Sequence, residues 1–213
     1  MGVLVSPVSR VRRRQFVKTA ALEQVVKRTQ GYLRAGYCIH LEGPTGIGKT
    51  TLAMHLADCQ DRPMLLVLGG HNLAVCGEFD QHSSWLKLAC HQGLTLVYDG
   101  FNRSRPETNT RLLSVLEERV LILAGEQGPE CVPVHPDFRV IFTSDSGDYC
   151  GTYSSSNALI DRVITIRLPE PSSLAQRQIL ERVGLSPEAA TLVIEIVHQF
   201  FQQVFPEGGA SLR

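Results

Sequence analysis

One eight-residue segment, GPTGIGKT from Gly43 to Thr50, constrains the fold of this chain more than any other. It matches the pattern GxxxxGK[ST], and it stands between an apolar run ending at Leu41 and a helical pattern that continues from Thr51. A strand, a glycine-rich turn and a helix in this order direct backbone N–H groups and the positive end of the helix toward one point. The segment therefore predicts a phosphate-binding loop.

This predicted loop supplies the candidate cofactor-binding residues. Lys49 is expected to reach the β- and γ-phosphates of a nucleotide, and the Thr50 hydroxyl is expected to help hold Mg²⁺. The full candidate set is Gly43, Pro44, Thr45, Gly46, Ile47, Gly48, Lys49, Thr50 and Thr51. ATP and Mg²⁺ are the expected cofactors. The seven histidines form no HxxxH or HExxH pattern, so no further metal is expected.

Apolar runs alternate with helical patterns along most of the chain. Besides the run before the loop, runs at 64–68, 94–98, 139–144 and 163–166 predict buried strands. Helical spacing predicts helices at about 19–35, directly after the loop, at 85–90, from Pro106 and at 157–161. This alternation predicts an α/β fold, a doubly wound parallel sheet of five strands that binds its ligand at the carboxyl ends of the strands.

Three regions are expected. Residues 1–18 form a basic arm, residues 19–168 the P-loop ATPase core, and residues 169–213 a partial lid made of helices at 172–183 and 187–204. Within the core, apolar runs at 120–123 and 131–134 predict a hairpin that stands off the main sheet.

Charge and composition narrow the class of protein. The chain carries 21 basic and 21 acidic residues, yet its first 18 residues hold five basic residues and no acidic one, leaving 16 basic against 21 acidic residues in the remainder. A solvated terminus explains such an arm better than nucleic-acid binding does. No apolar run approaches the roughly 20 residues of a membrane span, and the six cysteines show no CxxC spacing. A soluble cytoplasmic protein without a membrane span is expected.

The third predicted strand ends in Asp99, where P-loop enzymes keep the carboxylate that orders water around Mg²⁺. Hydrolytic ring ATPases mostly place Glu directly after this Asp to orient the attacking water, whereas Gly100 stands here. Glycine can neither accept a proton nor hold a water molecule. If nothing replaces that Glu, the chemical step should slow by roughly 10²–10⁴-fold while nucleotide binding survives.

Three stretches resemble a known family. YLRAGYCIHLEGPTGIGKTTLAMHLA, LTLVYDGFNRSRPETNTRLLSVLEE and VHPDFRVIFTSDSGDYCGTYSSSNALIDRVITI are similar to the GvpN gas-vesicle ATPases of the MoxR branch of AAA+ proteins. The runs FNRSRPE and HPDFR are more particular to that family than the P-loop is. The resemblance covers about residues 16–168.

The resemblance implies further site residues. Asp145 stands where the family has its sensor-1 Asn, and Arg162 matches the arginine finger that reaches the nucleotide of a neighbouring subunit. The catalytic candidates are therefore Lys49, Asp99, Asp145 and Arg162, with Thr50 and Asp99 as metal ligands. Arg213 resembles a lid arginine at the γ-phosphate, and the segment Phe16-Val17 is expected near the adenine.

The resemblance also implies a function: an oligomeric AAA+ ring, associated with gas vesicles and acting on their shell or accessory proteins through ATP-driven remodelling. Two alternatives stay open. One is an activase of a metabolic enzyme resembling CbbQ and NorQ. The other is a nucleotide-binding assembly factor that does not hydrolyse ATP, which Gly100 and Asp145 both favour. A nucleic-acid-binding role for the basic arm is a more distant third.

Overall fold

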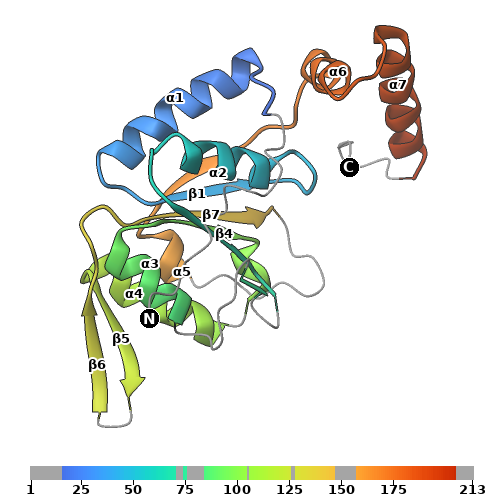
Figure 1. The fold of residues 1–213 in the computed structure, drawn as a ribbon. Helices are drawn as coiled ribbons and strands as arrows, with labels where there is room; N and C mark the ends of the chain where they lie inside the picture. The colour runs from blue at the N-terminus through green and yellow to red at the C-terminus, as the bar shows by residue number, and fades with distance from the viewer. Residues whose placement is uncertain are drawn as a thin grey trace.

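The computed structural model describes residues 16–70, 74–75, 84–104, 106–125, 128–146 and 157–204. Its centre is a sheet in the order β3-β2-β4-β7-β1-β8, with helices on both faces (Figure 1). The basic arm up to residue 15 and the lid residue Arg213 lie outside the described residues.

Five parallel strands form the body of the sheet, as predicted. They are β1 (Ile39–Gly43), β2 (Met64–Leu68), β4 (Thr95–Asp99), β7 (Arg139–Asp145) and β8 (Ile164–Arg167). A sixth strand, β3 (Ala74–Val75), pairs antiparallel with β2 at the edge. Sequence periodicity does not predict this strand, because two residues in a polar stretch are too few to show it.

Helices cover the two faces of the sheet separately. Helices α1 (Ala20–Arg34) and α2 (Lys49–Asp58) lie over one face, and α3 (Ser84–Gln92), α4 (Pro106–Glu117) and the short α5 (Asn157–Ile160) lie over the other (Figure 1). Each face has its own apolar core. Alternate residues of β4 divide between them, because Leu96 and Tyr98 pack toward α3 and α4 whereas Val97 packs toward α2.

The predicted hairpin is present as β5 (Val120–Gly125) and β6 (Gly128–Pro133), which form a separate two-stranded sheet that projects from the core (Figure 1). Leu121, Leu123 and Val132 anchor it in the core beneath α3 and α4. The 3₁₀ turn η2 (Phe101–Arg103) follows β4 directly and carries buried Phe101 into the same core.

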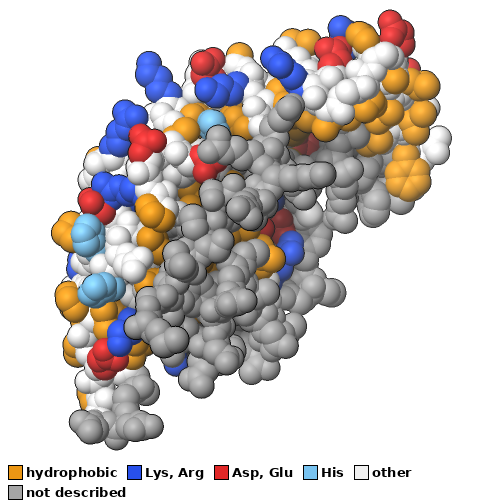
Figure 2. All heavy atoms as spheres, viewed as in Figure 1, with side chains coloured by type: hydrophobic (Ala, Val, Ile, Leu, Met, Phe, Trp, Pro, Cys, Tyr) orange, Lys and Arg blue, Asp and Glu red, His pale blue; other side chains and the backbone are white. Residues whose placement is uncertain are grey.

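Two helices, α6 (Ser173–Arg182) and α7 (Pro187–Val204), stand apart from the sheet in the region predicted to form the lid (Figure 1). The Ser172 hydroxyl caps α6 by accepting a hydrogen bond from the Ala175 N–H. Hydrophobic side chains gather on the surface over α7 (Figure 2), where Leu192, Ile196 and Phe200 are each more than half exposed. Among the described helices, none has the length and apolar character needed to span a bilayer.

The carboxyl ends of β2 and β4 touch through two glycines. The Gly69 N–H donates to the Asp99 carbonyl at 2.7 Å. A Cβ atom on Gly69 would lie 2.0 Å from the Gly100 carbonyl oxygen, closer than any real contact. This close approach fixes the backbone that carries Asp99 and Gly100.

We predict that Gly69→Ala lowers the free energy of unfolding by about 1–3 kcal/mol, because the methyl group must push two strand ends apart. Urea denaturation measures the change. Gly31→Ala is the matched control, since a Cβ there meets nothing within 4 Å and alanine is favoured over glycine in a helix by about 0.5–1 kcal/mol. Equal stability of both variants would contradict the prediction.

Candidate functional site

The loop between β1 and α2 has the backbone shape of a phosphate cradle. Gly46 and Gly48 both adopt positive φ, +90° and +92°, which residues with a Cβ rarely adopt. A Cβ on Gly43 would lie 2.5 Å from the Ile47 side chain and 3.0 Å from the Leu168 carbonyl oxygen. The glycines of the motif are therefore required by geometry, and α2 begins at Lys49 with its positive end at the loop.

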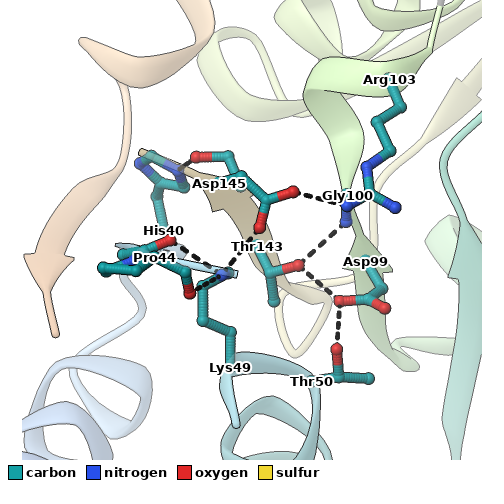
Figure 3. A network of polar contacts seen from close by, with 11 residues as sticks. His40, Pro44, Lys49, Thr50, Asp99, Gly100, Arg103, Thr143 and Asp145 are labelled. Atoms are coloured by element: carbon teal, nitrogen blue, oxygen red, sulfur yellow. Dashed lines mark hydrogen bonds and ion pairs between the residues drawn. The ribbon is translucent and has the colours of Figure 1, made fainter. Parts of the chain in front are cut away.

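Lys49 is buried, and its ammonium group uses all three of its N–H donors within the chain (Figure 3). It donates to the Gly43 carbonyl at 2.8 Å, to the Pro44 carbonyl at 2.7 Å and to Asp145 Oδ1 at 2.9 Å. The side chain thus ties the loop to the carboxyl end of β7.

Asp99 accepts hydrogen bonds from two hydroxyl groups that belong to different elements (Figure 3). Thr50 Oγ1 donates to Asp99 Oδ1 at 2.7 Å from the first turn of α2, and Thr143 Oγ1 donates to the same oxygen at 2.5 Å from β7. Thr143 in turn accepts the Gly100 N–H at 2.9 Å. The carboxylate is therefore held in one orientation beside Thr50.

Asp145 lies between two cations. Its Oδ1 accepts from Lys49 and its Oδ2 from Arg103, and its side chain is only 7% exposed. Burial acts to raise the pKa of Asp145, but the hydrogen bonds from Lys49 and Arg103 outweigh burial and hold the pKa below its ordinary value. Asp145 is therefore ionised at neutral pH, and its carboxylate forms an ion pair with the P-loop lysine, Lys49.

Sequence reasoning missed Arg103 and Thr143. Arg103 reaches Asp145 from η2, and Thr143 supports Asp99 from β7, two residues before Asp145. Both lie within FNRSRPE and HPDFRVIFTSD, the stretches that carry the family resemblance. A signal was available for Thr143, because alternation along a strand places residues 143 and 145 on one face.

Below the site, His40 on β1 joins two neighbouring strands. Its Nε2 lies 2.8 Å from Ser144 Oγ on β7, and its Nδ1 lies 3.1 Å from Thr165 Oγ1 on β8. Burial lowers the pKa of His40 to about 4, so the ring is neutral at pH 7. This buried histidine is a structural link between strands.

Gly100 follows Asp99 with φ +67° and ψ +43°, a left-handed conformation. A Cβ there would meet only the Arg103 side chain, at 3.4 Å or more, so a side chain has room but its backbone would be strained. Glu117 and Glu118 do not replace the missing carboxylate, because the first binds Arg162 and the second is exposed. The Glu107 side chain lies outside what the structure describes.

Arg162 is not brought to the P-loop of its own chain. Its Nε and Nη2 donate to Glu117 Oε2 at 3.0 and 2.7 Å, and its Nη1 donates to the Ala158 carbonyl at 2.6 Å. The guanidinium is 31% exposed beside the end of α4. Its role as an arginine finger stays a prediction.

A cavity of about 700 Å³ opens beside the P-loop, between the core and the lid. Phe16, Val17 and Ile47 line it from the core side, and Leu180 of α6 and Val183, the residue after α6, line it from the other. Gly46, Gly48 and Thr51 also border it. The Phe16 ring stacks on His55 of α2 at 4.1 Å between ring centres, which holds the segment before α1 against the P-loop helix.

The residues present suit a magnesium ion that arrives with a nucleotide. Thr50 and Asp99 offer a hydroxyl and a carboxylate oxygen side by side, and hard oxygen donors are those that Mg²⁺ prefers. Within the described ranges, no three His, Cys, Asp or Glu side chains form a group that could hold a metal alone. Mg²⁺ sites commonly complete their coordination with substrate phosphates and water.

The chain is similar to several known proteins. It is 36% identical over 215 residues to the gas vesicle ATPase GvpN of Ancylobacter aquaticus, covering 87% of this chain and 60% of that protein. It is 39% identical to GvpN of Haloferax mediterranei, covering 72% of this chain and 52% of that protein. The chain thus spans little more than half the length of these relatives.

Solved structures agree on the fold. A variant of RuvB from Thermotoga maritima superposes with a TM-score of 0.59 at 16% identity, covering 91% of this chain and 67% of that one. The AAA domain family (dynein-related subfamily) matches residues 39–163, from β1 to just before β8. That range holds the P-loop, Asp99, Asp145 and Arg162, and by this match the chain belongs to the AAA domain family.

Proposed function

We propose that this chain binds Mg·ATP at its P-loop and works within an oligomeric AAA+ ring that assists gas vesicle assembly in the cytoplasm by ATP-driven remodelling. The observation that carries the proposal is the convergence of Lys49, Thr50, Asp99 and Asp145 on a loop shaped for phosphate. Similarity to proteins named gas vesicle ATPase supports the biological setting and favours it over an activase of a metabolic enzyme.

Lys49 changes partner when a triphosphate binds. Its three donors are all in use, so a phosphate oxygen must replace one of the three acceptors. Asp145 is the acceptor that would be replaced, because it is the only one of the three on a side chain and the other two are backbone carbonyls of the loop. Arg103 then keeps the Asp145 carboxylate paired after Lys49 turns away. Bound ATP supplies the terminal phosphoryl group, and the protein supplies position and charge.

Two side chains next to the loop could hold the Mg²⁺ that accompanies ATP. Thr50 and Asp99 would be its protein ligands, and Thr143 acts as a positioning residue because its hydroxyl fixes the orientation of Asp99. The P-loop N–H groups and the positive end of α2 face the same phosphates.

The large cavity suits the base of the nucleotide. Its walls at Phe16, Val17 and Ile47 are apolar, as a purine ring requires, and Leu180 and Val183 belong to the lid. A base bound between these walls contacts core and lid together, so nucleotide binding would draw the lid toward the core. Movement of lid against core is the step that remodelling requires.

Arg162 completes the site only between subunits. Because it lies beside Glu117 and away from the P-loop of its own chain, a role at the nucleotide requires the P-loop of a neighbour. A planar guanidinium there would stabilise charge on the transferring phosphate. This requirement is our reason for placing the site in a ring.

A second candidate function is a nucleotide-binding assembly factor that turns ATP over slowly or not at all. Gly100 favours it, since glycine has no side chain that could act as a base next to Asp99, and Glu117 is paired with Arg162. Asp145 is a poor base, because its pKa is held low.

We predict that Lys49→Ala weakens Mg·ATP binding by about 100-fold or more and that Asp145→Asn strengthens it, since the second change removes a negative charge that competes for Lys49. Isothermal titration calorimetry measures both. Lys87→Ala, on the exposed side of α3, is the control and should bind as the wild type does. Absence of saturable Mg·ATP binding by the folded wild-type chain would overturn the proposal.

We predict that Gly100→Glu raises the ATPase rate by roughly 10²–10⁴-fold, because it restores a carboxylate that orients water. The left-handed backbone makes any side chain here cost about 1–2 kcal/mol of stability. Gly100→Gln carries the same strain without a base and should stay slow. Brisk turnover by the wild type, unimproved by the glutamate, would exclude the assembly factor that does not hydrolyse ATP.

We predict that Arg162→Ala and Lys49→Ala, each inactive alone, restore ATPase activity when mixed, because about a quarter of the interfaces then join an intact P-loop to an intact arginine. If the wild-type rate is too low to follow, the Gly100→Glu background serves. A mixture of Lys49→Ala with Thr50→Ala is the control and should stay inactive, since no subunit in it has a complete P-loop. Rings that form without recovery would contradict the role of Arg162.

A further inference from the structure

A second cavity, of about 250 Å³, lies at the end of the sheet away from the P-loop. Thr95 and Arg139, the first residues of β4 and β7, line it, whereas the last residues of these strands are Asp99 and Asp145 of the nucleotide site. The ends of α1 and α2 form its other walls. Helix α2 therefore starts at one cavity and finishes at the other.

Positive charge exceeds negative charge around this second cavity. Three guanidinium groups, of Arg34, Arg62 and Arg139, face two carboxylates, of Asp61 and Asp137. Arg62 is already paired, because its Nη1 lies 2.9 Å from Asp137 Oδ1. Asp61 is exposed. The remaining charges around the cavity are therefore two positive ones, on Arg34 and Arg139, and one negative one, on the exposed Asp61.

Arg139 is partly buried without a carboxylate partner. Its Nε donates to the Leu33 carbonyl at 3.0 Å, and its Nη1 donates to the Pro136 and Phe138 carbonyls at 2.6 and 2.8 Å. These bonds fix the guanidinium and also satisfy a carbonyl at the negative end of α1. Burial is the largest cause that lowers the pKa of Arg139; the charges of Arg119 and Arg62 lower it further, whereas Cys38 and Asp137 act to raise it. A bound anion would offset the cost of burying this cation.

We propose that this cavity binds a small tetrahedral oxyanion of the phosphate type, held by Arg139 and Arg34. Its volume is below the roughly 300–1,000 Å³ of pockets that enclose larger organic ligands, which favours an anion of a few atoms. Phosphate carries more negative charge and more acceptor oxygens than a carboxylate, so two guanidinium groups favour it over a carboxylate. Since α2 joins the two cavities, the anion would sit behind the helix that holds the nucleotide.

The test is titration of the full chain with inorganic phosphate while saturating Mg·ADP fills the P-loop. A second arm repeats it without nucleotide in the Lys49→Ala variant, so that the result does not depend on nucleotide binding. Saturable binding at one site in both arms is expected. Acetate at equal ionic strength should bind at least about tenfold more weakly. Absence of saturable phosphate binding in either arm, or equal binding of acetate, would overturn the proposal.

One variant locates the anion without disturbing the fold. Arg34→Gln removes an exposed charge for which no hydrogen bond or ion pair is found among the described residues. It should weaken phosphate binding about tenfold while leaving the unfolding midpoint without phosphate unchanged. Arg28→Gln, an exposed arginine of the same helix, is the control. Wild-type affinity in Arg34→Gln, or an equal loss in the control, would place the anion elsewhere and overturn the proposal.

Discussion

The ammonium group of Lys49 is the interaction on which the site depends. It lies out of water and makes three hydrogen bonds, two to the loop backbone and one to Asp145 of β7. A buried cation is tolerated only when its donors are satisfied, and here one of the three acceptors is a carboxylate 96 residues away from the lysine in the chain. The glycine-rich loop, the first turn of α2 and the end of β7 therefore hold one another in place before any ligand binds.

The sheet explains why the polar groups meet. Parallel strands end at the same edge, so the side chains of Asp99, Thr143 and Asp145 project toward the loop after β1. The close contact between Gly69 and Gly100 fixes the position of the end of β4 relative to the end of β2. Buried apolar strands thus position the charged groups.

Much of the fold was predictable because burial leaves a periodic trace in the sequence. The helix 187–204 and the strand 64–68 were predicted with the bounds that the structure has. The P-loop was predictable because its shape requires glycine at defined positions. Strand β3 was not, because two residues carry no period. The contacts of Arg103 and the pairing of Arg162 with Glu117 were not predictable either, because the sequence around an exposed arginine does not indicate which carboxylate it will pair with.

The pair between Arg162 and Glu117 bears on how subunits would associate. An arginine that must meet a neighbour's phosphate first has to leave its own counter-ion, so one electrostatic contact is exchanged for another and the net gain is small. The cohesion of the proposed ring must then come from other surfaces. Arg162 would then contact the phosphate when the neighbouring subunit holds a nucleotide, and it would stay paired with Glu117 when the neighbour holds none.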